Sequence, residues 1–203
     1  MTEHIVFHRD FPTSYECSPL SELPGVATDL LYFHPSCSLH ANHDGLLVMI
    51  EPMNGEPWIG VFEWGSPSPN SSLSGFWSLP NKDHVCAVSR GVAYIVPVAD
   101  AGKYTVVPLR PICHVLPVPS EDLIVFGDFT KLCAFGKDGY LWTTTDLSWD
   151  GLEISVVDGS CVTGTGWDAP SQARVGFRVD LETGRHEGGS APPLRRNRDV
   201  LCK

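Results

Sequence analysis

Short apolar segments alternate with turn residues along most of the chain, from about residue 45 to residue 189. Several of them, including residues 122–127, 140–144 and 174–179, are rich in β-branched and aromatic side chains. Such segments, with apolar and polar positions alternating, are typical of half-buried strands. Strand starts recur about every 8 to 12 residues, which is the spacing of meandering antiparallel sheets. The pattern predicts an all-β fold, either a partial propeller-like meander or a two-sheet sandwich.

The residues between these segments are those that tight turns require. Asn54-Gly55 separates two apolar runs at residues 46–50 and 58–64, and this arrangement predicts a hairpin. Gly136-Lys-Asp-Gly139 and Glu182-Thr-Gly184 supply glycines, which adopt the positive φ angles of such turns without steric cost.

The pattern divides the chain into three parts. Residues 1–44 contain four prolines and are expected to form an irregular segment, a strand plus loops, packed on the main domain. Residues 45–187 are expected to form the all-β domain. Residues 188–203 are rich in glycine, proline and arginine, and they predict a flexible basic tail.

Charge narrows the classes of partner. The net charge is −10 although the tail is basic, so the remainder of the chain is strongly acidic. An acidic body repels nucleic acid and anionic membranes and attracts basic proteins. The first residues lack the basic-then-apolar pattern of a signal peptide, and no run of about 20 apolar residues occurs. We therefore expect a cytoplasmic protein that binds another protein, and the charge favours a basic one.

The cysteines agree with this location. Their number, seven, is odd and their spacing is irregular, so we expect reduced thiols rather than a disulfide framework. Cys86, Cys113, Cys133 and Cys161 lie in or beside apolar runs, where a free cysteine behaves as a small buried hydrophobic residue.

Two segments resemble the blades of quinoprotein-like β-propellers. They are Ala134-Phe-Gly-Lys-Asp-Gly-Tyr-Leu-Trp142 and Phe177-Arg-Val-Asp-Leu-Glu-Thr-Gly-Arg185. The resemblance implies four-stranded sheets arranged as blades. At about 40 to 45 residues per blade, the chain has room for three or four blades, fewer than a full ring.

One cluster contains possible metal ligands. His34, Cys37, His40 and His43 recur at intervals of three residues, and Asp44 follows the last of them. Imidazole and thiolate groups are common ligands of zinc. Cys37, His40 and His43 are the candidate ligands, with one position left for water and Asp44 in hydrogen-bonding contact with a ligand. Pro35 disfavours a single helical face carrying all of them, so exposed loop histidines are the alternative.

No motif for a serine hydrolase, a phosphate-binding loop or a dinucleotide-binding fold is present. Trp77, Trp149 and Trp167 follow a polar loop or precede an aspartate, and they are the candidate exposed binding residues. The sequence therefore predicts a non-enzymatic binding or protein-interaction module, and an immunity-type protein that neutralises a basic toxin is one example that fits the charge. The alternatives are a zinc-binding protein or metal-dependent hydrolase built on residues 34–43, and a carbohydrate-binding protein that uses exposed tryptophans.

Overall fold

A computed structural model describes residues 5–25, 29–36, 43–65 and 73–192. In this part of the chain the regular structure consists of strands and two short 3-10 helices, η1 (Ala101–Lys103) and η2 (Pro119–Glu121). No helix in the described residues is long and apolar enough to cross a membrane. The fold is all-β, as the alternating pattern predicts.

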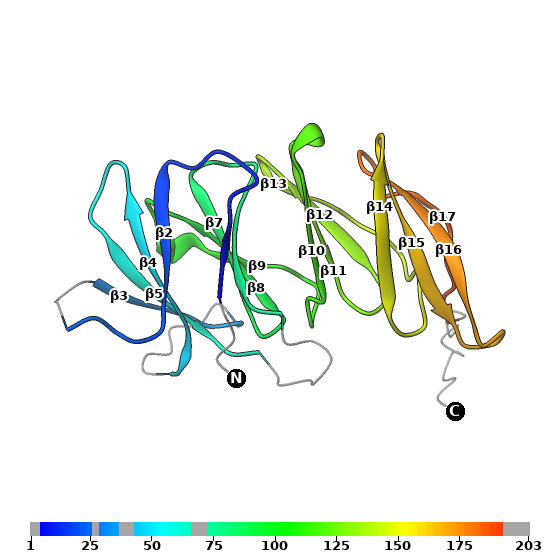
Figure 1. Cartoon of the computed structure of the whole chain (residues 1–203), viewed down its shortest axis with the longest axis horizontal. Helices are drawn as coiled ribbons and strands as arrows, with labels where there is room; N and C mark the ends of the chain where they lie inside the picture. The colour runs from blue at the N-terminus through cyan, green and yellow to red at the C-terminus, as the bar shows by residue number, and fades with distance from the viewer. Residues whose placement is uncertain (1–4, 26–28, 37–42, 66–72, 193–203) are drawn as a thin grey trace, which may run out of the picture.

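Four sheets stand side by side, in chain order from left to right in Figure 1. The first sheet has the order β2 (Tyr15–Leu20), β4 (Gly45–Pro52), β5 (Trp58–Glu63) and β3 (Asp29–Phe33). The second sheet has the order β1 (Phe7–His8), β6 (Gly75–Ser78), β7 (His84–Ser89), β8 (Val92–Pro97) and β9 (Thr105–Val106).

The other two sheets are simple meanders in which each strand pairs with the next. The third contains β10 (His114–Val118), β11 (Leu123–Gly127), β12 (Leu132–Gly136) and β13 (Gly139–Thr143). The fourth contains β14 (Leu152–Asp158), β15 (Cys161–Asp168), β16 (Ala173–Asp180) and β17 (His186–Gly188). Four sheets of this kind match the propeller-like alternative and not the two-sheet sandwich.

Three apolar cores lie between successive sheets. Phe33 and Phe62 of the first sheet stack with ring centroids 4.4 Å apart and pack against Tyr94 of the second. The second core joins β7 and β8 to β11 and β12, and the third joins the third sheet to the fourth. Both faces of the two middle sheets are therefore buried, which explains the nearly continuous apolar runs of β7, β8, β11 and β12.

The fourth sheet has one apolar and one polar face. Val162, Phe177 and Val179 face the third core. Glu153 pairs with Arg174 at 2.9 Å and accepts a hydrogen bond from Thr165. Because side chains alternate along a strand, these polar residues lie on the opposite face. That face does not offer the apolar surface on which the other sheets are packed.

Residues 1–44 differ from the irregular segment that the sequence predicts. The described residues of this segment form three strands: β2 and β3 flank β4 and β5 in the first sheet, and β1 pairs in parallel with β6 of the second. The partners of β1 and β3 are distant in sequence, so local pattern carries little information about them. Pro19 lies within β2, which is an edge strand and so tolerates a residue without an N–H group.

The predicted hairpins are present. β4 and β5 pair antiparallel on either side of Asn54-Gly55, and β12 and β13 are joined by Lys137-Asp138. The segments 134–142 and 177–185, compared above with propeller blades, form a strand-turn-strand unit and the end of a strand followed by a turn. The resemblance to quinoprotein-like blades in particular stays a prediction, because these two elements are common to many β proteins.

Candidate functional site

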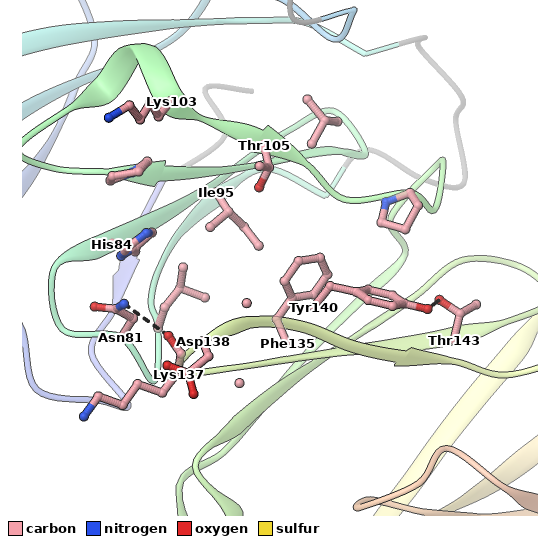
Figure 2. Close-up of a pocket in the computed structure, with 16 residues that line it drawn as sticks. Asn81, His84, Ile95, Lys103, Thr105, Phe135, Lys137, Asp138, Tyr140 and Thr143 are labelled. Carbon is pink, nitrogen blue, oxygen red and sulfur yellow. Dashed lines mark hydrogen bonds between the residues drawn. The ribbon is translucent and has the colours of Figure 1, made fainter.

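A cleft of about 880 Å³ opens between the second and third sheets (Figure 2). One wall comes from β7, β8, η1 and β9, and the other comes from the hairpin of β12 and β13. Its volume lies within the usual range of ligand pockets. The cleft is lined by Leu79, Asn81, His84, Ile95, Pro97, Lys103, Thr105, Val106, Pro108, Phe135, Gly136, Lys137, Asp138, Gly139, Tyr140 and Thr143.

The floor of the cleft is apolar and rigidly packed. Leu79, Ile95 and Phe135 belong to the second core and are less than 10% exposed. The Phe135 ring meets Phe126 edge to face at 5.7 Å, which fixes it from below. The cleft therefore has a preformed apolar floor.

Tyr140 covers part of this floor and is itself exposed. Its ring meets Phe135 edge to face at 5.7 Å, and its hydroxyl donates a hydrogen bond to Thr143 Oγ1 at 3.2 Å. The residue is 56% exposed, and the adjacent Leu141 is 48% exposed. Figure 2 shows Tyr140 below Ile95 and Thr105 of the opposite wall.

A β-bulge explains why Tyr140 lies in the cleft. In an unbroken strand Tyr140 and Trp142 would share a face. The pairing of β12 with β13 shifts between Ala134 and Phe135, so Tyr140 pairs with Phe135 whereas Trp142 pairs with Ala134. Tyr140 thus lies on the side of the second core, and Trp142 packs into the third. Bulges often redirect a side chain in this way.

Polar groups surround the apolar floor. Asn81 donates a hydrogen bond from Nδ2 to the Lys137 carbonyl oxygen at 3.1 Å, which ties the hairpin tip to the second sheet. Lys103 Nζ lies 2.7 Å from Asp100 Oδ2. His84 Nδ1 is buried and has no hydrogen-bond partner among the described residues. Burial lowers the pKa of His84, against a smaller opposing effect of Asp83.

The His84 imidazole has no nucleophile beside it among the described residues. The Tyr15 hydroxyl donates a hydrogen bond to the His84 backbone oxygen at 2.8 Å, but no hydroxyl or thiol of the described residues is hydrogen-bonded to the His84 imidazole. The cysteine two residues along, Cys86, is fully buried, and its pKa is raised by desolvation. An apolar floor with a few polar groups at its rim is the usual composition of a binding site.

The tryptophans predicted as binding residues lie elsewhere. Trp77 is 5% exposed and belongs to the second core, with His8 stacked on its ring at 4.9 Å, so it is not a surface residue. The strand that carries it, β6, is buried on both faces, which a local turn pattern does not reveal. Trp149 and Trp167 are half-buried and adjacent, and Trp149 donates its indole N–H to Ser190. Neither lines the cleft.

Of the three candidate zinc ligands, the structure describes His43. Cys37 and His40 lie outside the described residues. His43 contacts the Tyr32 ring at 5.2 Å and lies 6.5 Å from the His34 ring. His34 Nε2 is 2.9 Å from Glu63 Oε2. Among the described residues, no group of three His, Cys, Asp or Glu side chains has the geometry to hold a metal ion.

The sequence pattern does not identify Tyr140, His84, Lys103 or Lys137 as residues of a site. The Gly136–Gly139 turn predicted the hairpin that carries two of them, but the bulge that exposes Tyr140 has no signature in the sequence. The opposite wall comes from strands about 40 residues earlier, so the cleft arises only from packing of the two sheets.

Comparisons with known proteins leave the family open. No protein-family model and no curated protein matches the chain. Among solved structures, the N-terminal domain of Nup159 is similar at 13% identity and a TM-score of 0.38, over 94% of this chain and 55% of that one. A complex of S. cerevisiae Dbp5 bound to Nup159, Gle1, IP6 and ADP matches at 13% identity and a TM-score of 0.39, over 90% of this chain and 52% of that one. The chain thus spans about half the length of the chains it matches. Similarity at this level carries no information about function.

Proposed function

We propose that the chain is a non-enzymatic protein-binding module and that the cleft between the second and third sheets receives a segment of its partner. The observation that carries this proposal is Tyr140, an exposed aromatic residue held over a buried apolar floor in a cleft of about 880 Å³. Tyrosines in such positions are frequent anchors of protein interfaces, because they add contact area with few rotatable bonds.

The strands that border the cleft support an extended segment as the occupant. β9 and β13 are the last strands of their sheets, so each has an edge that no further strand of its own sheet covers among the described residues. Open edges commonly bind extended peptides by adding a strand. The acidic character of the chain, whose net charge is −10, would speed association with a basic partner. An immunity-type protein bound to a basic toxin is one interaction of this kind.

Selection of peptides tests the proposal. A library of random linear peptides is displayed on phage and enriched on the immobilised full-length chain, and the selected peptides are measured by fluorescence polarisation. Tyr140→Ser should weaken them at least tenfold, on the order of 1.4 kcal/mol, as expected for loss of an aromatic anchor.

Leu141→Ser is the matched control. Leu141 is the next residue on the same strand and is similarly exposed, but it does not line the cleft. Peptides should bind this variant as they bind the wild type. Failure to enrich any peptide, or equal binding to wild type and to both variants, would exclude the cleft as the docking site. Far-ultraviolet circular dichroism checks that both variants are folded.

Zinc binding by Cys37, His40 and His43 is a second candidate function. The observation in its favour is that His43 Nε2 is buried without a hydrogen-bond partner in the described part of the chain. A buried nitrogen without a partner is costly unless it binds a proton donor or a metal. Elemental analysis of the purified chain, before and after chelation, tests this candidate. About one zinc per chain in wild type and none in His43→Ala would support it, and no metal in the wild type would refute it.

A further inference from the structure

The charge of the cleft differs from that of the body. The described part of this acidic chain contains four lysines, Lys82, Lys103, Lys131 and Lys137. Two of them, Lys103 and Lys137, line the cleft, one from each wall. Asp138 is the one carboxylate among the described residues that line it. Among the lining side chains, lysines therefore outnumber carboxylates two to one in a molecule whose overall charge is −10.

Both ammonium groups are available to a ligand. Lys137 is exposed, and no carboxylate lies within ion-pair distance of its Nζ among the described residues. Its backbone oxygen is held by Asn81, so the hairpin tip is fixed while the side chain stays in solvent. Lys103 pairs with Asp100, but its side chain is 80% exposed. An exposed pair of this kind is weak, so Lys103 can exchange Asp100 for another carboxylate.

Resting on the function proposed above, we propose that the partner segment docked in this cleft carries carboxylate groups beside an apolar anchor. The apolar side chain packs on Phe135 and Tyr140, and its acidic neighbours pair with Lys103 and Lys137 at the rim. Complementary charges at the rim of an interface select among partners and set the rate of association. The segment that enters the cleft is thus acidic, even where the rest of the partner is basic.

Two synthetic peptide pools test whether the cleft binds an acidic or a basic segment. Both pools have an apolar or aromatic residue at the central position and the same random neutral positions. The flanking positions are glutamate in one pool and lysine in the other. Binding of each pool to the full-length chain is measured by fluorescence polarisation at low and at high salt.

The glutamate pool should bind more tightly than the lysine pool, and added salt should reduce the difference, because the pairs are exposed. Each of Lys103→Gln and Lys137→Gln should weaken the glutamate pool by up to about fivefold, the range of single exposed ion pairs. Lys82→Gln is the control, because Lys82 is exposed and follows Asn81 in sequence but does not line the cleft. It should leave both pools unchanged.

The outcomes separate this inference from the proposed function. If the lysine pool binds as tightly as the glutamate pool or more tightly, and Tyr140→Ser still weakens it, the cleft is a docking site but the inferred acidic segment is wrong. Equal effects of the Lys82 variant and the two cleft variants would also overturn the inference. If neither pool binds and random selection also fails, the docking cleft itself is refuted.

Discussion

The indole N–H of Trp142 donates a hydrogen bond to the backbone oxygen of Leu181 at 2.8 Å, which joins the third sheet to the turn that follows β16. Trp142 is 7% exposed and lies in the core that these two sheets share. Because of the bulge between β12 and β13, Trp142 and Tyr140 lie on opposite faces of β13, and Tyr140 is turned toward the cleft. One irregularity in β13 therefore serves both the packing of the fourth sheet and the exposure of the candidate anchor.

Trp142→Phe should destabilise the chain by about 2 kcal/mol or more. The change removes the donor to the buried Leu181 oxygen and leaves a void where the larger ring packed. Urea denaturation followed by circular dichroism measures the loss. Trp167→Phe, at a half-buried tryptophan in the fourth sheet, should cost clearly less. Similar losses in the two variants would show that the hydrogen bond and the burial of Trp142 add little.

Gly184→Ala should destabilise the same junction. Gly184 has a φ of +69°, and a Cβ there would lie 2.6 Å from Trp142 Cδ2. The left-handed conformation and the contact with a fixed ring each oppose any side chain, so we expect a loss of about 2 kcal/mol. The matched change is Gly176→Ala in β16, where a Cβ meets no atom within 4 Å. Thermal unfolding of both variants should show a lower midpoint for Gly184→Ala, and an unchanged midpoint would contradict the contact.

A structural feature was predictable from the sequence where the residues that form it lie close together along the chain. The turn at Asp180 was predictable, because its carboxylate accepts hydrogen bonds from Thr183 N and Oγ1 within a few residues. The hairpin at 136–139 was predictable for the same reason. The burial of Trp77 was not predictable, because it depends on strands far away in sequence. The parallel pairing of β3 was not predictable for the same reason. The cleft combines two such distant elements, so its residues could be recognised only after the sheets were placed.

Thiol reactivity should follow burial rather than position in the sequence. Desolvation raises the pKa of Cys133 to about 12 and that of the half-buried Cys113 to about 11, each with a smaller contribution from Asp128. Because the thiolate is the reactive form, Cys113 should react with a disulfide reagent before Cys133 does in the native chain. Mass spectrometry of peptides after timed labelling measures the order. Unfolding in denaturant is the control, in which all seven cysteines should react.

The free energy of unfolding should fall as the pH is lowered through about 6.5, in part because of His84. Burial depresses the pKa of His84 in the folded chain, so the unfolded chain binds its proton at a higher pH than the folded chain does. Stability from this group is therefore complete above the unfolded value of about 6.5 and is lost as the pH falls toward the folded value. His84→Gln removes the titration, so its stability should vary less steeply with pH between about 7 and 5.

The control for the His84 experiment is the same comparison at higher pH. Above about pH 8 the imidazole is neutral in both states, and the two stability curves should run parallel, offset by whatever the substitution costs in packing. Urea titrations at several pH values give both curves. A constant offset across the whole range would mean that folding does not change the proton affinity of His84, and His84 would then contribute nothing to the acid sensitivity of the fold.

Because His84 lines the cleft, docking of an acidic peptide at Lys103 and Lys137 should also reduce the acid sensitivity of the fold. A carboxylate near the imidazole favours its protonated form, so the pKa of His84 in the folded chain moves back toward its value in the unfolded chain.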